Sequence, residues 1–235
     1  MLLYLPNYLP MEDNKENVKV IELAKKYNLD LDKLKQEQIK LAKGLEIKDK
    51  IDFKLADSFG AIDNTFFGNK LLSCIIVCNK DMEIIDRAYV VEKVKFPYIP
   101  GFRNYREMPA MVAAYDKLNE KPDVIFVPAN GILNARLGLA SHLGLALGVP
   151  TIGVSNSNSD CEFKGDVLFR NGKKVGRILL SKEGSNPLYI SPGNLISVET
   201  AFDLTKLMIR APHKRPEPLH FAAKYTKEVR KEINQ

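Results

Sequence analysis

The chain has few of the side chains that bind zinc or form disulfide bonds. It contains three cysteines and three histidines, and no cysteines stand in a Cys-x-x-Cys spacing. Cys74 and Cys78 lie four apart in the apolar run 71-LLSCIIVC-78, where they share one face of a strand without the geometry of metal ligands. We therefore expect small buried thiols in a reducing compartment, and no zinc site.

Long hydrophobic runs are also missing. The first ten residues, MLLYLPNYLP, are apolar but lack a basic leading segment and are interrupted by Pro6 and Pro10. They make a poor signal peptide and no membrane span, and no other apolar run approaches membrane length. We expect a cytoplasmic protein, and translation from either Met1 or Met11 fits the sequence.

The chain shows no internal repeat and no low-complexity segment, so its 235 residues suit one large domain. We expect a loose leader over 1–16 and a single domain over 17–235. Within that domain we expect a helical arm over 17–50, a core over 51–210 and a C-terminal tail over 211–235. The net charge of +6 and pI of about 9.0 are compatible with a nucleic-acid partner but do not require one.

The apolar pattern predicts a mixed α/β fold. Three strands are expected over 59–67, 71–79 and 83–96, the first two joined by the hairpin turn Gly68-Asn69. A helix from about Asn104, with Asn104 as its cap, precedes a buried strand over 123–128. A helix (137–148), a strand (149–154), a β-ribbon (162–191) and a helix (197–209) follow. This order resembles the ribonuclease H-like layout, a mixed sheet with helices on both faces.

The strand 123-DVIFVP-128 lacks a polar residue where such a strand usually presents one. It ends at Pro128 and Ala129, neither of which can act as an acid, a base or a metal ligand. The loop and small-residue helix that follow, 130-NGILNARLGLASHLGLALG-148, nevertheless have the layout of a functional site. A polar group is therefore missing from the place where a site is expected.

Asp63 and Glu107 are the candidate carboxylates. Asp63 stands inside the apolar run GAIDNTFF, where a charge costs free energy unless it is paired or metal-bound, although an acid near the Gly68-Asn69 turn can also simply face water. Glu107 is expected in the first turn of its helix. There it either complements the helix dipole or faces Asp63 as a second metal ligand.

The segment 97-PYIPG-101 is a stiff loop, because Pro97 and Pro100 restrict the backbone around Tyr98 and Ile99. Two interpretations stand: a rigid connector with an inward-packed aromatic, or an apolar wedge that replaces a stacked base. Arg103 and Arg106 follow and either contact phosphates or are solvated.

The segment PYIPGFRNYREMPA resembles the endonuclease V family, deoxyinosine-directed repair nucleases with a ribonuclease H-like fold. The resemblance continues through FGAID, GILNARLGLASHLGLALGVPTIGV, YISPGNLISVETAFDL and RPEPLHFAAKYTKEVR, and covers roughly residues 30–232. It implies a protein that recognises inosine sites in DNA or RNA, and we expect a monomer without a membrane partner. It also implies hydrolysis of the second phosphodiester 3′ of the lesion with Mg²⁺, or with Mn²⁺ in its place.

The resemblance assigns roles to matching residues. Asp63 and Glu107 match the catalytic, metal-binding carboxylates, and Tyr98 matches the wedge that fills the gap left by the flipped base. Gly131 matches a glycine of the loop that receives the lesion. The candidate substrate-binding residues are Pro97, Tyr98, Ile99, Pro100, Arg103, Asn130, Gly131 and Asn194.

Departures from the family pattern gather in the active site. Pro128 stands where the family has its other metal-binding aspartate, in a Val-Asp-Gly strand end. Asn194 replaces the histidine of Ser-Pro-Gly-His, and Ser155-Asn156 lacks the lysine common after the Thr-Ile-Gly-Val strand. The His-Pro-Arg that often follows the loop is Asn134-Ala135-Arg136 here, and the loop is one residue shorter.

The departures predict a weakened Mg²⁺ site. Mg²⁺ requires near-octahedral oxygen ligands, and the amide oxygens of Asn130 and Asn194 carry no charge that replaces a missing carboxylate. Asp160 is the one nearby acid that can substitute, because Asp123 begins its strand at the opposite end from Pro128.

Three hypotheses remain open. The chain cuts slowly with a reduced metal site, it binds inosine-containing nucleic acid without cutting, or the scaffold serves a protein partner. Asp63 and Glu107 favour the first, and Pro128 and Asn194 favour the second. The intact PYIPG segment argues against the third, which leaves impaired or absent hydrolysis as the favoured prediction.

Overall fold

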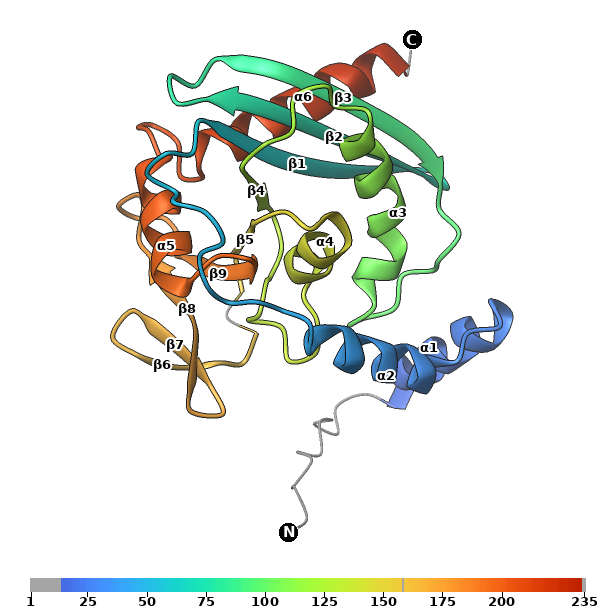
Figure 1. Cartoon of the computed structure of the whole chain (residues 1–235). Helices are drawn as coiled ribbons and strands as arrows, with labels where there is room; N and C mark the ends of the chain where they lie inside the picture. Colours follow the sequence, from blue (N-terminus) through green and yellow to red (C-terminus); the bar gives the residue numbers. More distant parts are fainter. Residues whose placement is uncertain (1–13, 158, 234–235) are drawn as a thin grey trace.

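The computed structural model describes residues 14–157 and 159–233 (Figure 1). Most of the leader expected over 1–16 lies outside the described residues. The expected α/β architecture is confirmed: in the described residues one mixed sheet has nine strands in the order β3-β2-β1-β4-β5-β9-β8-β7-β6.

The strands comprise a central sheet and a ribbon that extends it. Their bounds are β1 (Ser58–Phe67), β2 (Lys70–Asn79), β3 (Ile84–Lys93), β4 (Val124–Val127), β5 (Thr151–Ser155), β6 (Glu162–Lys164), β7 (Val167–Arg170), β8 (Lys173–Leu179) and β9 (Leu188–Asn194). The strands β1, β4 and β5 run parallel, whereas β2, β3 and β9 pair antiparallel with their neighbours. The carboxyl ends of β1, β4 and β5 therefore share one edge of the sheet.

The first hairpin forms where the sequence predicts it. Eight consecutive residues of β2 are buried, because this strand lies inside the sheet with helices on both faces. Gly68 supplies the left-handed backbone (φ 54°) of the turn that pairs Phe67 with Lys70. The turn sets the register that brings Asp63 opposite Cys74.

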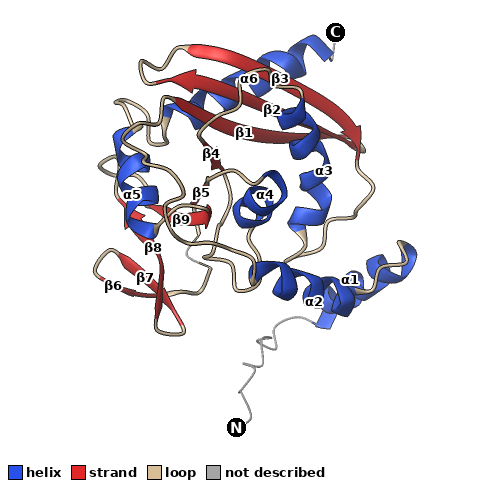
Figure 2. Cartoon of the chain, in the orientation of Figure 1, coloured by secondary structure: helices blue, strands red, loops and turns tan. Residues whose placement is uncertain are grey.

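Helices cover both faces of the sheet (Figure 2). The helices α3 (Arg103–Asp116) and α4 (Leu139–Leu147) pack on one face, and α5 (Val198–Leu207) and α6 (Glu217–Ile233) pack on the other. Cys74 and Cys78 are buried as expected, and burial raises the pKa of both thiols to about 12.

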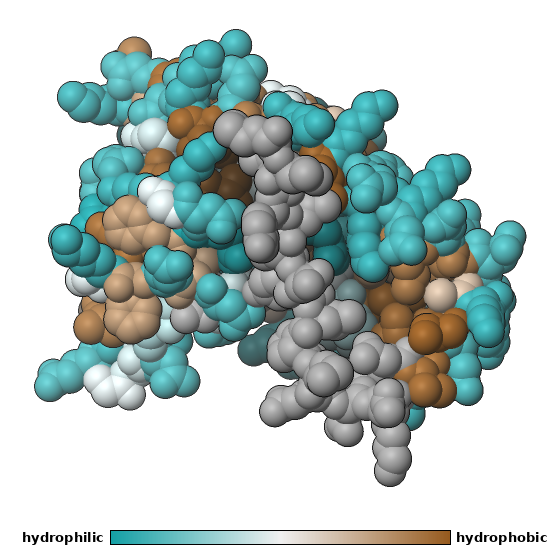
Figure 3. Space-filling model, turned by 90° about the horizontal axis from the view of Figure 1, so that it is seen from below, coloured by the Kyte–Doolittle hydropathy of each residue, from teal (hydrophilic) through white to brown (hydrophobic). Residues whose placement is uncertain are grey.

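Two helices form the N-terminal arm, α1 (Asn14–Lys26) and α2 (Leu31–Ala42). The side chain of Asp30 caps α2 by accepting the N–H of Lys33 at 2.9 Å. Figure 3 shows apolar side chains gathered over this arm, where Val18 and Ile21 are both more than half exposed. Within residues 14–157 and 159–233, no helix is long and apolar enough to cross a membrane.

Two local predictions were wrong. The helix α3 begins at Arg103 after Phe102, which makes no side-chain cap, so Asn104 is not a cap and Glu107 lies beyond the first turn. The strand β9 continues to Asn194, beyond the end of the β-ribbon expected over 162–191.

Candidate nucleic-acid site at the ends of the parallel strands

A pocket of about 230 Å³ opens beyond the carboxyl end of β4. Two loops and two helix starts supply its walls. The lining residues are Tyr98, Ile99, Pro100, Gly101, Arg103, Asn104, Ala129, Asn130, Asn134, Leu137, Gly138 and Leu139. The structure therefore brings together most of the residues that the sequence predicted for substrate binding.

The stiff loop at the mouth of this pocket presents one aromatic ring to solvent. Tyr98 is 64% exposed, whereas Ile99 beside it is 2% exposed and anchors the loop in the fold. An exposed aromatic next to an anchored apolar residue has the form of a stacking surface. The alternative of an inward-packed Tyr98 does not agree with its exposure.

A hydrogen-bond network holds the loop against the N-terminal arm. Gln38 of α2 is fully buried; its Nε2 donates to the Gly101 carbonyl at 3.0 Å, and its Oε1 accepts Arg136 Nε at 2.7 Å. Arg136 also donates to the Gly101 carbonyl at 3.0 Å. Asn104 donates to the Leu137 carbonyl at 3.0 Å. No local sequence signal identified Gln38, because its partners lie far along the chain.

Next to the lining residue Asn130, the loop after β4 packs backbone against backbone on β5 and β9. A Cβ on Gly131 would stand 2.1 Å from the Pro192 carbonyl oxygen, and a Cβ on Gly153 would stand 2.4 Å from the Gly131 nitrogen. These glycines are needed because no side chain fits between the loop and strands β5 and β9. Gly131 does not line the pocket, and its expected role in the loop that would receive a base stays a prediction.

The two candidate asparagines have different environments. Asn130 lines the pocket, its Nδ2 donates to Ser159 Oγ, and its buried Oδ1 has no hydrogen-bond partner among the described residues. Asn194 lies away from the pocket lining, with its Oδ1 accepting the Glu46 N–H at 2.9 Å and its Nδ2 donating to the Gly144 carbonyl at 3.2 Å. Its substrate-binding role stays a prediction, while its contacts support the arm and α4.

Asp63 and Asn64 point to opposite faces of β1, as successive strand residues do. Asp63 is half-buried on the α6 side. Burial raises its pKa, and the Thr226 hydroxyl and the positive charge of Arg215 partly offset that effect. Neither neighbour was identified from the sequence, because both belong to the C-terminal part of the chain.

Glu107 lies on the face of β1 to which Asn64 points, and Asn64 and Arg103 bond its carboxylate. Its side chain is 4% exposed, and its Oε1 accepts Arg103 Nε at 2.5 Å. Its Oε2 accepts Arg103 Nη2 at 3.0 Å and Asn64 Nδ2 at 2.8 Å. Arg103 therefore forms a two-pronged ion pair with Glu107, in addition to lining the pocket.

This arrangement does not fit a divalent ion. Both oxygens of Glu107 are bonded by Arg103 and Asn64, Asp63 lies against Thr226, and Pro128 has no donor atom in its side chain. The described residues contain no group of three acidic, histidine or cysteine side chains that could hold a metal. The predicted metal role of Asp63 and Glu107 stays a prediction.

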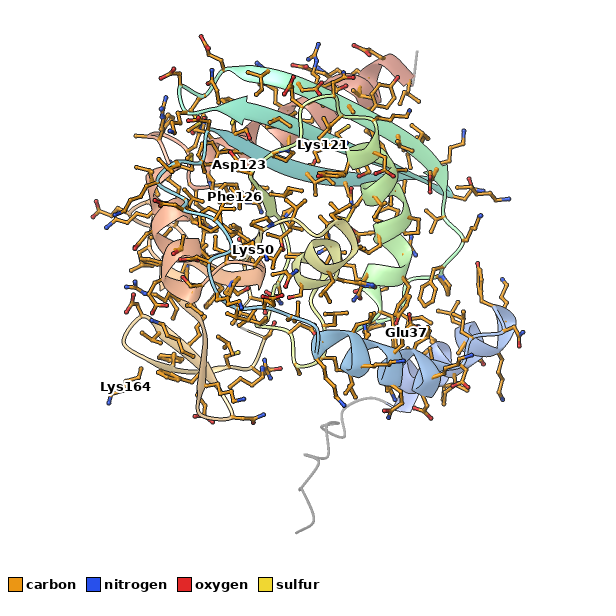
Figure 4. All side chains as sticks on the ribbon, viewed as in Figure 1. Glu37, Lys50, Lys121, Asp123, Phe126 and Lys164 are labelled. Carbon is orange, nitrogen blue, oxygen red and sulfur yellow. The ribbon has the colours of Figure 1, made fainter. Side chains whose placement is uncertain are left out.

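The remaining acids do not complete a carboxylate set in the described part of the chain. Asp123 accepts the backbone N–H groups of Asp57 and Ser58 at 2.9 and 3.0 Å, at the amino end of β4. Figure 4 labels Asp123, which precedes β4, and Phe126, which lies in it. Pro128 follows the carboxyl end of β4, so Asp123 and Pro128 lie at opposite ends of the strand. Asp160 is exposed in the loop after β5 and lies near Cys161.

The model of the endonuclease V family matches residues 39–224. The chain belongs to the endonuclease V family. It is similar to the endonuclease V of Thermosipho melanesiensis, with 36% identity over 183 residues that cover 74% of this chain and 80% of that protein. It is also similar to the endonuclease V of Archaeoglobus fulgidus, with 32% identity over 212 residues, 87% of this chain and 96% of that protein.

Solved endonuclease V structures share the fold. The Bacillus subtilis structure gives a TM-score of 0.80 at 24% identity and covers 87% of this chain and 94% of that chain. A Ciona intestinalis endonuclease V, in complex with a 24mer DNA containing an inosine followed by a ribo-adenosine, gives 0.76 at 21% identity, covering 86% and 98%. The ribonuclease H-like sheet expected from the sequence is thus confirmed as that of endonuclease V.

Proposed function

We propose that this endonuclease V family member binds inosine in a DNA or RNA strand, and that its metal-dependent hydrolysis of the phosphodiester is reduced or absent. The environment of the Asn130 side chain is the observation that carries the proposed recognition of inosine. The Oδ1 of this side chain is buried in the pocket wall without a hydrogen-bond partner among the described residues. A buried acceptor without a partner costs free energy that a ligand donor would recover.

The hypoxanthine base of inosine matches this acceptor. Its ring carries an N1–H donor on the pairing edge, where adenine carries an unprotonated nitrogen acceptor. A base that leaves its stack and enters the pocket can donate this hydrogen to Asn130 when the side chain turns its buried oxygen toward the pocket. The exposed ring of Tyr98 supports the same proposal, because it can stack in the gap that the base leaves.

Pro128 and the Arg103–Glu107 pair support the second half of the proposal. A metal ion needs free carboxylate oxygens, and here the guanidinium of Arg103 already neutralises Glu107. Neither the proline ring nor the Asn130 amide supplies a negative charge. The retained carboxylates Asp63 and Glu107 favour residual cutting, so nicking as well as binding has to be measured.

The test measures binding and nicking on the same strands. A single-inosine duplex, its undamaged counterpart and a single-stranded inosine RNA are incubated with the protein and Mg²⁺ or Mn²⁺. We expect the wild type to bind inosine strands more tightly than undamaged ones and to nick them slowly or not at all. Equal affinity for both kinds of strand would contradict the recognition proposal.

Three variants assign the result to residues. Tyr98→Ala should weaken inosine binding more than undamaged-strand binding, whereas an equal reduction on both would refute the wedge. Pro128→Asp should increase metal-dependent nicking, and Asp63→Ala should remove any nicking that depends on metal. If the wild type nicks the strand and Pro128→Asp nicks it no faster, the proposed impairment of hydrolysis is contradicted.

A further inference from the structure

A second pocket, of about 630 Å³, lies on the α6 side of the sheet. Four segments that are distant in the sequence build it: the residue after β5, the β8–β9 connection, the segment before α6 and the first turns of α6. The lining residues are Asn156, Lys182, Asn186, Pro212, His213, Lys214, Arg215, Leu219, His220 and Ala223. None of these was singled out as a binding residue from the sequence.

The pocket carries the positive charge of three side chains. Lys214 and Arg215 are half-buried and Lys182 is exposed. In the described part of the chain, no carboxylate lies within ion-pair distance of these three side chains, although the charge of Arg215 acts on Asp63 at longer range. A cluster of cations without direct ion pairs attracts anions, so the arrangement favours an anionic ligand.

Two stacked histidines form part of the same wall. The rings of His213 and His220 stack with centroids 3.7 Å apart and planes 19° apart. His213 Nδ1 lies 2.7 Å from Glu217 Oε1, and Glu217 is 5% exposed, so the carboxylate fixes the ring orientation. The lining therefore combines two amides and three cations, a donor set suited to phosphate oxygens.

Two contacts connect this pocket to the edge of the sheet where the first pocket opens. Asn156 follows β5, and Asn130 of the first pocket follows the neighbouring parallel strand β4. Ser159, in the loop that begins at Asn156, contacts the Asn130 side chain. Asp63 lies in β1 beyond the residues that pair with β4, and Arg215 acts on it from the second pocket.

We propose that the second pocket binds a backbone phosphate of the nucleic-acid strand whose inosine base enters the first pocket. This inference rests on the proposed function. Asn156 lines the second pocket and the nearby Ser159 contacts Asn130 of the first, so one strand that follows this loop can reach both pockets. The second pocket thus supplies affinity that does not depend on sequence, whereas the first supplies the preference for inosine.

The test measures how the dissociation constant for single strands, with and without inosine, depends on salt concentration. A triple variant, Lys182→Ala, Lys214→Ala and Arg215→Gln, removes the pocket charges. A matched control, Lys54→Ala, Lys80→Ala and Lys121→Ala, removes three charges near the amino end of β1 and β4, where Figure 4 labels Lys121. Circular dichroism spectra establish that both variants are folded.

We expect the pocket variant to bind both strands about tenfold more weakly, and its logarithmic salt dependence to fall by about 0.7 for each phosphate that it no longer neutralises. The control should change the salt dependence less. Equal salt dependence in the two variants would overturn the proposal. If the wild type prefers inosine strands in that case, the proposed function stands and only the second pocket is refuted.

A competition arm separates a strand phosphate from a free one. Inosine monophosphate and inorganic phosphate are added to the wild type and to the pocket variant while thermal unfolding is monitored. Two results together would assign the pocket to a free phosphate and refute strand binding. Either compound would stabilise the wild type but not the pocket variant, and the pocket variant would bind strands as well as the control does.

Discussion

The side chain of Arg103 takes part in two structural features, the pocket and an ion pair. It lines the predicted base pocket and pairs with the buried Glu107 through both guanidinium contacts. Arg103 and Glu107 were both predicted as site residues from the sequence, but as a phosphate contact and a metal ligand. Their mutual pairing, one turn apart on α3, was not foreseen, because the expected helix began after Arg103.

Arg103→Leu should lower the free energy of unfolding at neutral pH. It leaves the Glu107 carboxylate buried with only the Asn64 amide as a partner, which costs about 1–3 kcal/mol. Urea unfolding measures the change. The double variant with Glu107→Gln should recover part of this stability, since the uncompensated charge is then gone; a double variant no more stable than Arg103→Leu would contradict this cause.

Asn130 should determine the preference for inosine over adenosine. Asn130→Leu removes the buried acceptor, so the ratio of the two affinities should fall by about five- to one-hundredfold, the equivalent of one hydrogen bond. Asn130→Asp retains an acceptor at the same place and should retain the preference. Fluorescence anisotropy with matched strands measures the ratio, and an unchanged ratio in Asn130→Leu would show that another group reads the base.

At the scale of helices and strands, the predictions succeeded where the signal is local. The strand β1, the Gly68 turn and the apolar runs of β4 and β5 were each predicted from residues that are neighbours in the sequence. The predicted cap at Asn104 failed for the opposite reason. Its side chain bonds Gln38 and Leu137, and these tertiary contacts replace the local capping bond.

His142, in helix α4, should make the free energy of unfolding depend on pH. Burial lowers the pKa of this histidine from about 6.5, and its Nδ1 is buried without a hydrogen-bond partner among the described residues. The unfolded chain therefore takes up a proton more readily than the folded chain. The free energy of unfolding falls as the pH drops through 6.5 and below.

His142→Phe should reduce this pH dependence. The variant keeps an aromatic ring beside Tyr105, whose centroid lies 6.0 Å from that of His142, but cannot bind the proton. Urea unfolding at pH 7.5 and pH 5.5 gives the two free energies for each protein. If acidification destabilises the wild type and the variant equally, the dependence arises elsewhere, for example from His220, whose pKa burial also lowers.

At the scale of the whole molecule, the sheet and its helical layers followed from the sequence, but the two pockets did not. The pocket with the histidine pair joins residues 156, 182–186, 212–215 and 219–223, which no local pattern connects. The first pocket was predicted in part, because the stiff loop and the glycine loop each carry a sequence signal. The resemblance to endonuclease V suggested their roles, but not the hydrogen bonds that join them.

The buried side chain of Gln38 links the arm to the loop that carries Tyr98, since it bonds Gly101 on one side and Arg136 on the other. Thermodynamic linkage is reciprocal, so a strand that orders this loop must also slow the opening of α2. Hydrogen–deuterium exchange should therefore show the amides of residues 34–42 becoming protected when an inosine strand binds, although that helix lines neither pocket. In Gln38→Leu the protection of these amides on strand binding should be smaller, because the hydrogen bonds from this side chain to Gly101 and Arg136 are gone, while the Tyr105 hydroxyl still bonds the Leu34 carbonyl.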